Sequence, residues 1–104
     1  MFGVIHTDGS GGDDLPVERL SELYDELLTA DREHGEVAVI DNGSGWCLSA
    51  HRDGRLVFEH LEKGGERHMI PVPKERVLEL WKRLIDEDMD GLLSEPWKQG
   101  YGER

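Results

Sequence analysis

The chain contains few of the residues on which several classes of protein depend. Its single cysteine, Cys47, cannot form a disulfide within the 104 residues. No apolar run approaches the roughly 18 residues that a membrane-spanning helix needs. The apolar start, Met1–Ile5, is too short for the core of a signal peptide. We therefore expect a protein of the reducing cytoplasm.

Basic residues are also scarce. Lys and Arg number 12 against 23 Asp and Glu, which leaves a formal net charge of −11. Residues 13–33 and residues 86–95 together carry the whole excess. Such a field repels nucleic-acid phosphate and anionic lipid, and it speeds the encounter with basic partners. We therefore expect a basic protein partner and no direct contact with nucleic acid or membrane, although the charge can also serve solubility alone.

The length and the glycine distribution indicate one domain with a tail. A chain of 104 residues is the common size for a single fold. Residues 1–12 end in a Gly- and Ser-rich run without helical period and are predicted to form a flexible tail. Whether Phe2, Val4 and Ile5 add an edge strand stays open. Residues 13–104 are predicted to form the α+β domain.

Two segments have the apolar period of amphipathic helices. The first begins after a cap at Asp13 or Asp14 and ends near Ala30. The second begins at Pro73, because proline suits the first turn of a helix. The apolar positions are Leu20, Leu23, Tyr24, Leu27 and Leu28 in the first helix and Val77, Leu78, Trp81, Leu84 and Ile85 in the second. A short helical turn is expected around residues 89–94.

Between the helices, alternating residues predict antiparallel strands at residues 36–41, 46–51, around 55–59 and at 67–70. Pro71 and Pro73 end the last of these strands. Two main helices on one face of about four strands give a small α+β fold with a meander sheet.

The turn at residues 52–54 allows two registers between the second and third strands. A two-residue loop would place Leu48 opposite Glu59, whereas a three-residue loop with Gly54 in the left-handed conformation pairs Leu48 with Phe58. We favour the second register because it separates apolar from polar residues. It buries Trp46, Leu48, Ala50, Leu56 and Phe58 and turns Cys47, Ser49, His51, Arg55 and Glu59 outward.

One segment resembles part of a calcium-binding loop. Asp86, Asp88 and Asp90 alternate and are followed by Gly91, a spacing that can surround a hard cation with oxygen ligands. The bidentate glutamate that closes such loops is missing, because Trp97 stands at its position. The alternative is a helix end with solvated acids in which Asp88 caps the next turn. We predict no resident metal and keep calcium binding as an alternative function.

The pattern contains no signature of an enzyme. The five histidines are scattered, and no set of four ligands with zinc spacing is present. Cys47 and His51 share one strand face but lie roughly 13 Å apart, too far for a nucleophile and its base. The glycine pairs lie in hairpin turns rather than between a strand and a helix, so no phosphate loop is predicted. We therefore expect no catalytic residues and no cofactor.

Aromatic residues near the end of the chain accompany the second acidic segment. Trp97 and Tyr101 lie in a segment with two glycines, where they can either dock on the sheet or anchor a partner. Acids around an aromatic group suit a basic surface with an apolar centre. The predicted partner-binding residues are Glu87, Asp88, Asp90, Glu95, Trp97 and Tyr101.

The order of these features resembles a known group of proteins. A helix, an antiparallel meander, a Val72-Pro73 step into the last long helix and a near-terminal Pro96-Trp97 are similar to the small immunity proteins of bacterial polymorphic-toxin systems, particularly those that accompany deaminase toxins. The resemblance implies stoichiometric inhibition, in which the acidic face covers a basic toxin.

These observations lead to one main hypothesis for function. We expect a non-catalytic acidic binding protein that neutralises or regulates a basic protein partner. The alternatives are a calcium-responsive module, an enzyme whose site would draw on Cys47, His51 and His60, and an accessory domain with a partner of another kind.

Overall fold

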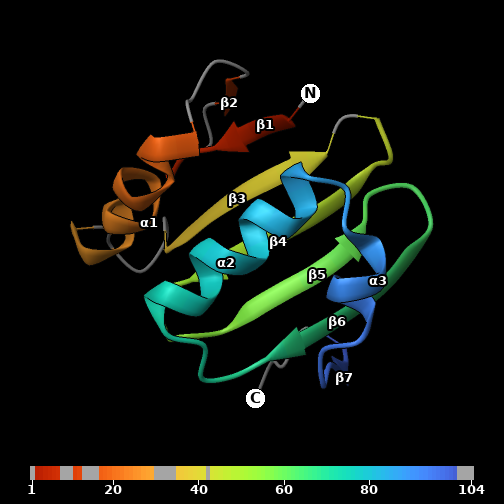
Figure 1. Cartoon of the computed structure of the whole chain (residues 1–104). Helices are drawn as coiled ribbons and strands as arrows, with labels where there is room; N and C mark the ends of the chain where they lie inside the picture. The colour runs from red at the N-terminus through yellow and green to blue at the C-terminus, as the bar shows by residue number, and fades with distance from the viewer. Residues whose placement is uncertain (1, 8–10, 13–16, 30–34, 42, 101–104) are drawn as a thin grey trace.

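The central element of the fold is an antiparallel sheet, and the helices lie against one of its faces (Figure 1). The computed structural model describes residues 2–7, 11–12, 17–29, 35–41 and 43–100. Within these ranges the sheet has seven strands in the order β2-β1-β3-β4-β5-β6-β7. The strands are β1 (Phe2–Ile5), β2 (Gly11–Gly12), β3 (Glu36–Asp41), β4 (Trp46–His51), β5 (Leu56–His60), β6 (Gly64–Met69) and β7 (Lys98–Gln99).

Three helices cover the front of the sheet in the view of Figure 1. Helix α1 (Leu20–Thr29) follows a 3-10 turn, η1 (Val17–Arg19), while α2 (Lys74–Ile85) and α3 (Met89–Leu93) come after the last long strand. The two main helices and the short turn were all expected. The predicted cap at Asp13 or Asp14 and the predicted end at Ala30 lie outside the described residues. No helix in the described part of the chain has both the length and the apolar character to cross a membrane.

The sheet is wider than the sequence predicted. Residues 2–5, which were assigned to the flexible tail with an edge strand left open, form β1 and pair with β3 in the register Val4 with Val39. Val4 is buried in the core, and Phe2 packs against it. The reason is the alternation of these two residues, which gives β1 an apolar face that the core can cover. The two-residue strands β2 and β7 extend the sheet at its edges, where so short a pattern gives no sequence signal.

The predicted register between β4 and β5 is confirmed. Leu48 pairs with Phe58 and Ala50 with Leu56, and Gly54 has a φ of +90°. All four paired residues belong to the core. The residues between them point to the opposite face of the sheet, but Cys47 and Ser49 are each only 3% exposed. An outward direction therefore did not mean solvent exposure, because small side chains in a central strand are covered by their larger neighbours.

Trp81 joins the layers at the centre of the core. Its side chain is buried, and its indole N–H donates a hydrogen bond of 3.0 Å to the carbonyl of Leu48 in β4. The ring also meets Tyr24 of α1 edge to face, with centroids 6.4 Å apart. One residue of α2 thus contacts both the sheet and the other main helix.

Candidate functional site

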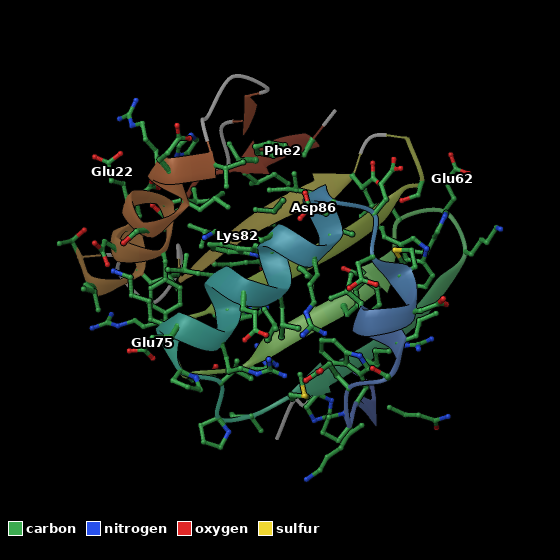
Figure 2. The ribbon with its side chains drawn as sticks, viewed as in Figure 1. Phe2, Glu22, Glu62, Glu75, Lys82 and Asp86 are labelled. Carbon is green, nitrogen blue, oxygen red and sulfur yellow. The ribbon has the colours of Figure 1, made fainter. Side chains whose placement is uncertain are left out.

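The candidate site is the acidic turn, residues 86–90, which joins α2 to α3. Helix α2 ends where the Asp86 N–H donates to the carbonyl of Lys82. Glu87 then adopts a left-handed conformation with a φ of 61°, which reverses the chain. The side chains of Asp86, Glu87, Asp88 and Asp90 are all exposed. Figure 2 labels Asp86 at the end of α2.

Within the acidic turn, Asp88 alone uses its carboxylate for an internal bond. It caps α3 by accepting a hydrogen bond of 3.1 Å from the Gly91 N–H, as the helix-end interpretation expected. The carboxylates of Asp86, Glu87 and Asp90 have no hydrogen bond or ion pair with another described residue. Three acidic groups of the turn are therefore available to a partner.

The geometry of the turn does not favour the calcium alternative. No three His, Cys, Asp or Glu side chains within the described residues converge so as to hold a metal ion. Asp88 is occupied as the helix cap, and Glu95, the nearest later acid, turns toward α2 instead. A calcium loop needs its carboxylates to surround one point, and here they spread along the surface.

Glu95 lies in an ion-pair network and is only 14% exposed. Its carboxylate accepts a hydrogen bond from Arg76 and lies 3.9 Å from the guanidinium of Arg83. Both arginines also pair with Glu79, at 2.8 and 3.1 Å. The hydrogen bonds to Glu79 and Glu95 raise the pKa of Arg76, and the bond from Arg76 lowers the pKa of Glu79. Glu95 therefore holds the segment after α3 against α2 and leaves no free charge for a partner.

Trp97 is docked on the sheet. Its indole N–H donates a hydrogen bond of 2.7 Å to the carbonyl of Leu92 in α3, and its ring stacks on Phe58 with centroids 5.3 Å apart. Phe58 stacks in turn on Trp46 at 4.6 Å. The side chain remains half-buried, so one part of the ring is left at the surface. Tyr101, the other predicted aromatic anchor, lies outside the described residues.

The acids of α1 have internal partners, unlike those of the acidic turn. Glu22 pairs with Arg19 at 2.5 Å, and Asp25 pairs with Lys74 at 2.7 Å. Glu26 meets the imidazole of His6 at 2.6 Å. Much of the negative charge that the sequence places on this helix is therefore balanced within a few ångströms.

The residues considered for an enzyme make contacts within the fold. Burial raises the pKa of the Cys47 thiol to about 11, so little thiolate forms at neutral pH. Burial also lowers the pKa of His51, whose Nδ1 lies 3.3 Å from the guanidinium of Arg55. His60 accepts hydrogen bonds of 3.2 and 3.1 Å from the backbone N–H groups of residues 62 and 63, which closes the turn between β5 and β6. These contacts give none of the three a partner suited to nucleophilic catalysis.

Sequence reasoning missed two cations near the end of the chain. Arg76 was not singled out, although its spacing from Glu79 is the i, i+3 spacing of a helical ion pair. Lys98 was not singled out either, because nothing in a Pro-Trp-Lys-Gln segment indicates that its lysine borders a pocket.

Comparison with models of protein families, with curated proteins and with solved structures found no match for this chain. Its function must therefore be argued from the geometry.

Proposed function

We propose that this protein is a non-catalytic binding protein and that its acidic turn contacts a basic region of a protein partner. The observation that carries the proposal is the contrast in pairing. Asp86, Glu87 and Asp90 are exposed and unpaired within the described structure, whereas the acids of α1 and Glu95 pair with an internal cation or, for Glu26, with the imidazole of His6.

The position of the turn supports a role outside the fold. Asp86 caps the C-terminal end of α2, where the partial negative charge of the helix dipole makes another anion unfavourable. Among the described residues, Glu87 alone combines a side chain with a positive φ. This conformation costs about 1–2 kcal/mol for an L residue. An acid at the end of α2, where it destabilises the protein, is better explained by a contact with a partner than by stability.

The neighbouring helix supplies an apolar contact. Leu93 of α3 is 46% exposed and lies three residues after Asp90. Exposed carboxylates attract a basic surface from a distance, and an apolar side chain among them gives the short-range contact that slows dissociation. We assign the binding surface to Asp86, Glu87, Asp88, Asp90 and Leu93.

The resemblance to immunity proteins suggests the kind of partner. If the partner is a basic toxin that acts on nucleic acid, the acidic turn would occupy the surface that the toxin uses for phosphate, and inhibition would be stoichiometric. The half-buried edge of Trp97 would then border the contact. This part of the proposal concerns the identity of the partner, while the acidic turn concerns how any basic partner is recognised.

Affinity capture with three baits tests the proposal. The first bait is the wild-type chain, and the second carries Asp86→Asn, Glu87→Gln and Asp90→Asn. The third is a matched control with Glu18→Gln, Glu62→Gln and Glu75→Gln, which changes the net charge equally at exposed residues elsewhere. A lysate of the source organism is passed over each bait and eluted with a salt gradient, and the eluted proteins are identified by mass spectrometry.

We expect the wild type and the control to retain the same basic protein, which salt releases. The turn variant should associate with the purified partner about tenfold more slowly at low salt, because steering depends on local charge. A toxin partner should also lose its activity at equimolar amounts of the wild-type chain. Equal retention of one partner by all three baits, or no specific partner at low salt, would contradict the proposal.

A further inference from the structure

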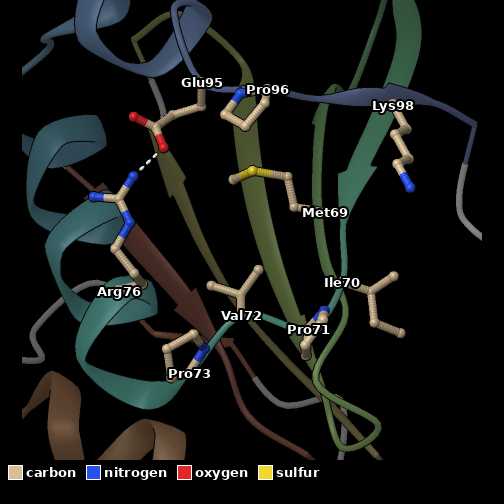
Figure 3. A pocket seen from close by; sticks show the side chains of 9 residues that line it. All are labelled: Met69, Ile70, Pro71, Val72, Pro73, Arg76, Glu95, Pro96 and Lys98. Carbon is tan, nitrogen blue, oxygen red and sulfur yellow. Dashed lines mark hydrogen bonds and ion pairs between the residues drawn. The ribbon is translucent and has the colours of Figure 1, made fainter.

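A pocket lies between the end of β6 and the segment that leads into β7 (Figure 3). Its volume is about 410 Å³, which falls in the range of about 300–1,000 Å³ typical of small-molecule sites. Most of its walls are apolar. The lining residues are Met69, Ile70, Pro71, Val72, Pro73, Arg76, Glu95, Pro96 and Lys98.

The prolines explain why the pocket is open. Strand β7 pairs with β6 through Lys98 with His68 and Gln99 with Arg67, and the pairing stops there. The residue that would continue the ladder on the same side is Pro96, which has no N–H to donate. The two chain segments therefore separate beyond the pair of Lys98 with His68, on the side of Pro96, and the space between them remains unfilled.

Some of the charged residues around the pocket have a partner of opposite charge, and one does not. Figure 3 shows the ion pair of Arg76 with Glu95 on one wall, where each charge is already compensated. Lys98 stands on the opposite side, is exposed, and has no hydrogen bond or ion pair with another described residue. The lining thus carries one unbalanced positive charge in a chain whose formal net charge is −11.

We propose that this pocket binds a small carboxylic acid with an apolar tail. The tail would lie against Met69, Ile70 and Val72, and the carboxylate would pair with the ammonium of Lys98. Burial of the tail supplies the attraction common to any apolar ligand, and the single unpaired cation selects an anion over a neutral or cationic head group. This site is separate from the acidic turn and does not depend on the proposed function.

Titration of the ¹⁵N-labelled full chain with three eight-carbon probes tests the proposal. The probes are octanoate below its micellar concentration, octanol and octylammonium, which share a tail and differ in charge. We expect octanoate to shift the amide resonances of Met69, Ile70, Val72 and Lys98 and to bind about two- to fivefold more tightly than octanol, the effect of one exposed ion pair. Octylammonium should bind more weakly than octanol.

Variants of Lys98 separate charge recognition from apolar binding. Lys98→Gln should weaken octanoate binding about two- to fivefold and leave octanol binding unchanged, and Lys98→Glu should reverse the preference toward octylammonium. Lys82→Gln removes an exposed lysine of α2 that does not line the pocket and serves as the matched control. The proposal fails if octanoate leaves these resonances unchanged, if octanol binds as tightly as octanoate, or if the Lys98 and Lys82 variants behave alike.

Discussion

Helix α1 and the acidic turn are both rich in carboxylates, but their surroundings differ. Glu22, Asp25 and Glu26 of α1 lie within 2.7 Å of a cation or an imidazole. Asp86 and Asp90 have no such neighbour among the described residues. Two segments of similar composition therefore present different fields to a partner. A local charge counted from the sequence overstates the charge that is available at the surface, because tertiary contacts balance part of it.

Glu95 gives the sharpest test, because it belongs to the acidic segment by sequence and to the paired group by structure. Glu95→Gln removes the negative charge that the guanidinium groups of Arg76 and Arg83 share, although the amide oxygen can still accept one hydrogen bond. We expect the free energy of unfolding to fall by about 1 kcal/mol, because Glu95 is 14% exposed but Arg76 is 37% exposed and solvent screens part of the attraction. Urea unfolding measures the change, and Glu75→Gln, an exposed change on α2, should alter the free energy of unfolding by less than about 0.5 kcal/mol. Equal effects of the two variants would place Glu95 with the unpaired acids.

Asp88 is the member of the acidic turn for which a structural role is expected. Asp88→Ala removes the acceptor of the Gly91 N–H and should lower the free energy of unfolding by about 1 kcal/mol. Asp88→Asn keeps an oxygen that can accept this bond and should restore most of the loss. Thermal unfolding of the two variants side by side gives the comparison. If asparagine destabilises the protein as much as alanine does, the charge matters and the cap does not.

Neutralising one acid from each region compares them directly. Asp25→Asn breaks the ion pair with Lys74, which is partly exposed, and should reduce the free energy of unfolding by about 0.5 kcal/mol at low salt. Asp86→Asn breaks no pair and removes an anion from the end of α2, so it should raise this free energy by a few tenths, roughly 0.3 kcal/mol. Both effects should shrink in 1 M salt, where the Debye length is about 3 Å. A loss of stability in Asp86→Asn would show that the turn is paired after all.

The pH dependence should show the smallest effect. The pKa of Glu79 is lowered in the folded protein, chiefly by the hydrogen bond from Arg76, relative to its ordinary value of 4.5. The unfolded chain therefore binds this proton first as the pH falls, and the stabilisation that is present above pH 4.5 is lost as the pH falls through the folded pKa. Carboxyl NMR should find Glu79 titrating below 4.5 in the wild type, and Arg76→Gln should move its midpoint upward. An unchanged midpoint would mean that the network does not hold this charge.

Local patterns were enough to predict much of the fold. The spacing of Val77, Trp81 and Leu84 predicted α2, and the separation of apolar from polar residues selected the register of Leu48 with Phe58. Both are short-range properties, because a helix face and a hairpin register depend on residues close together in the chain. The exposed Asp86–Asp90 segment was also visible as an acidic run.

Other features depended on contacts between distant segments. The sequence placed residues 2–5 in a tail and left an edge strand open, because three apolar residues among four do not reveal that β3 offers them a free edge. Glu95 looked like the other acids of its segment until the fold brought Arg76 within bonding distance. The burial of Cys47 likewise follows from its place between Ile40 and Glu59 on neighbouring strands.

The sequence by itself determined the α+β class, the main helices, the central hairpin and the sign of the field, because these follow from periodicity, turn chemistry and composition. Only the tertiary structure decided which acids remain unpaired, that Trp97 docks on Phe58 and that a pocket opens beside Lys98. The physical reason is that pairing and cavities depend on distances between side chains far apart in the chain. Composition counts the charges, but the packing of α2, β6 and the last segment determines which of them a partner or ligand meets.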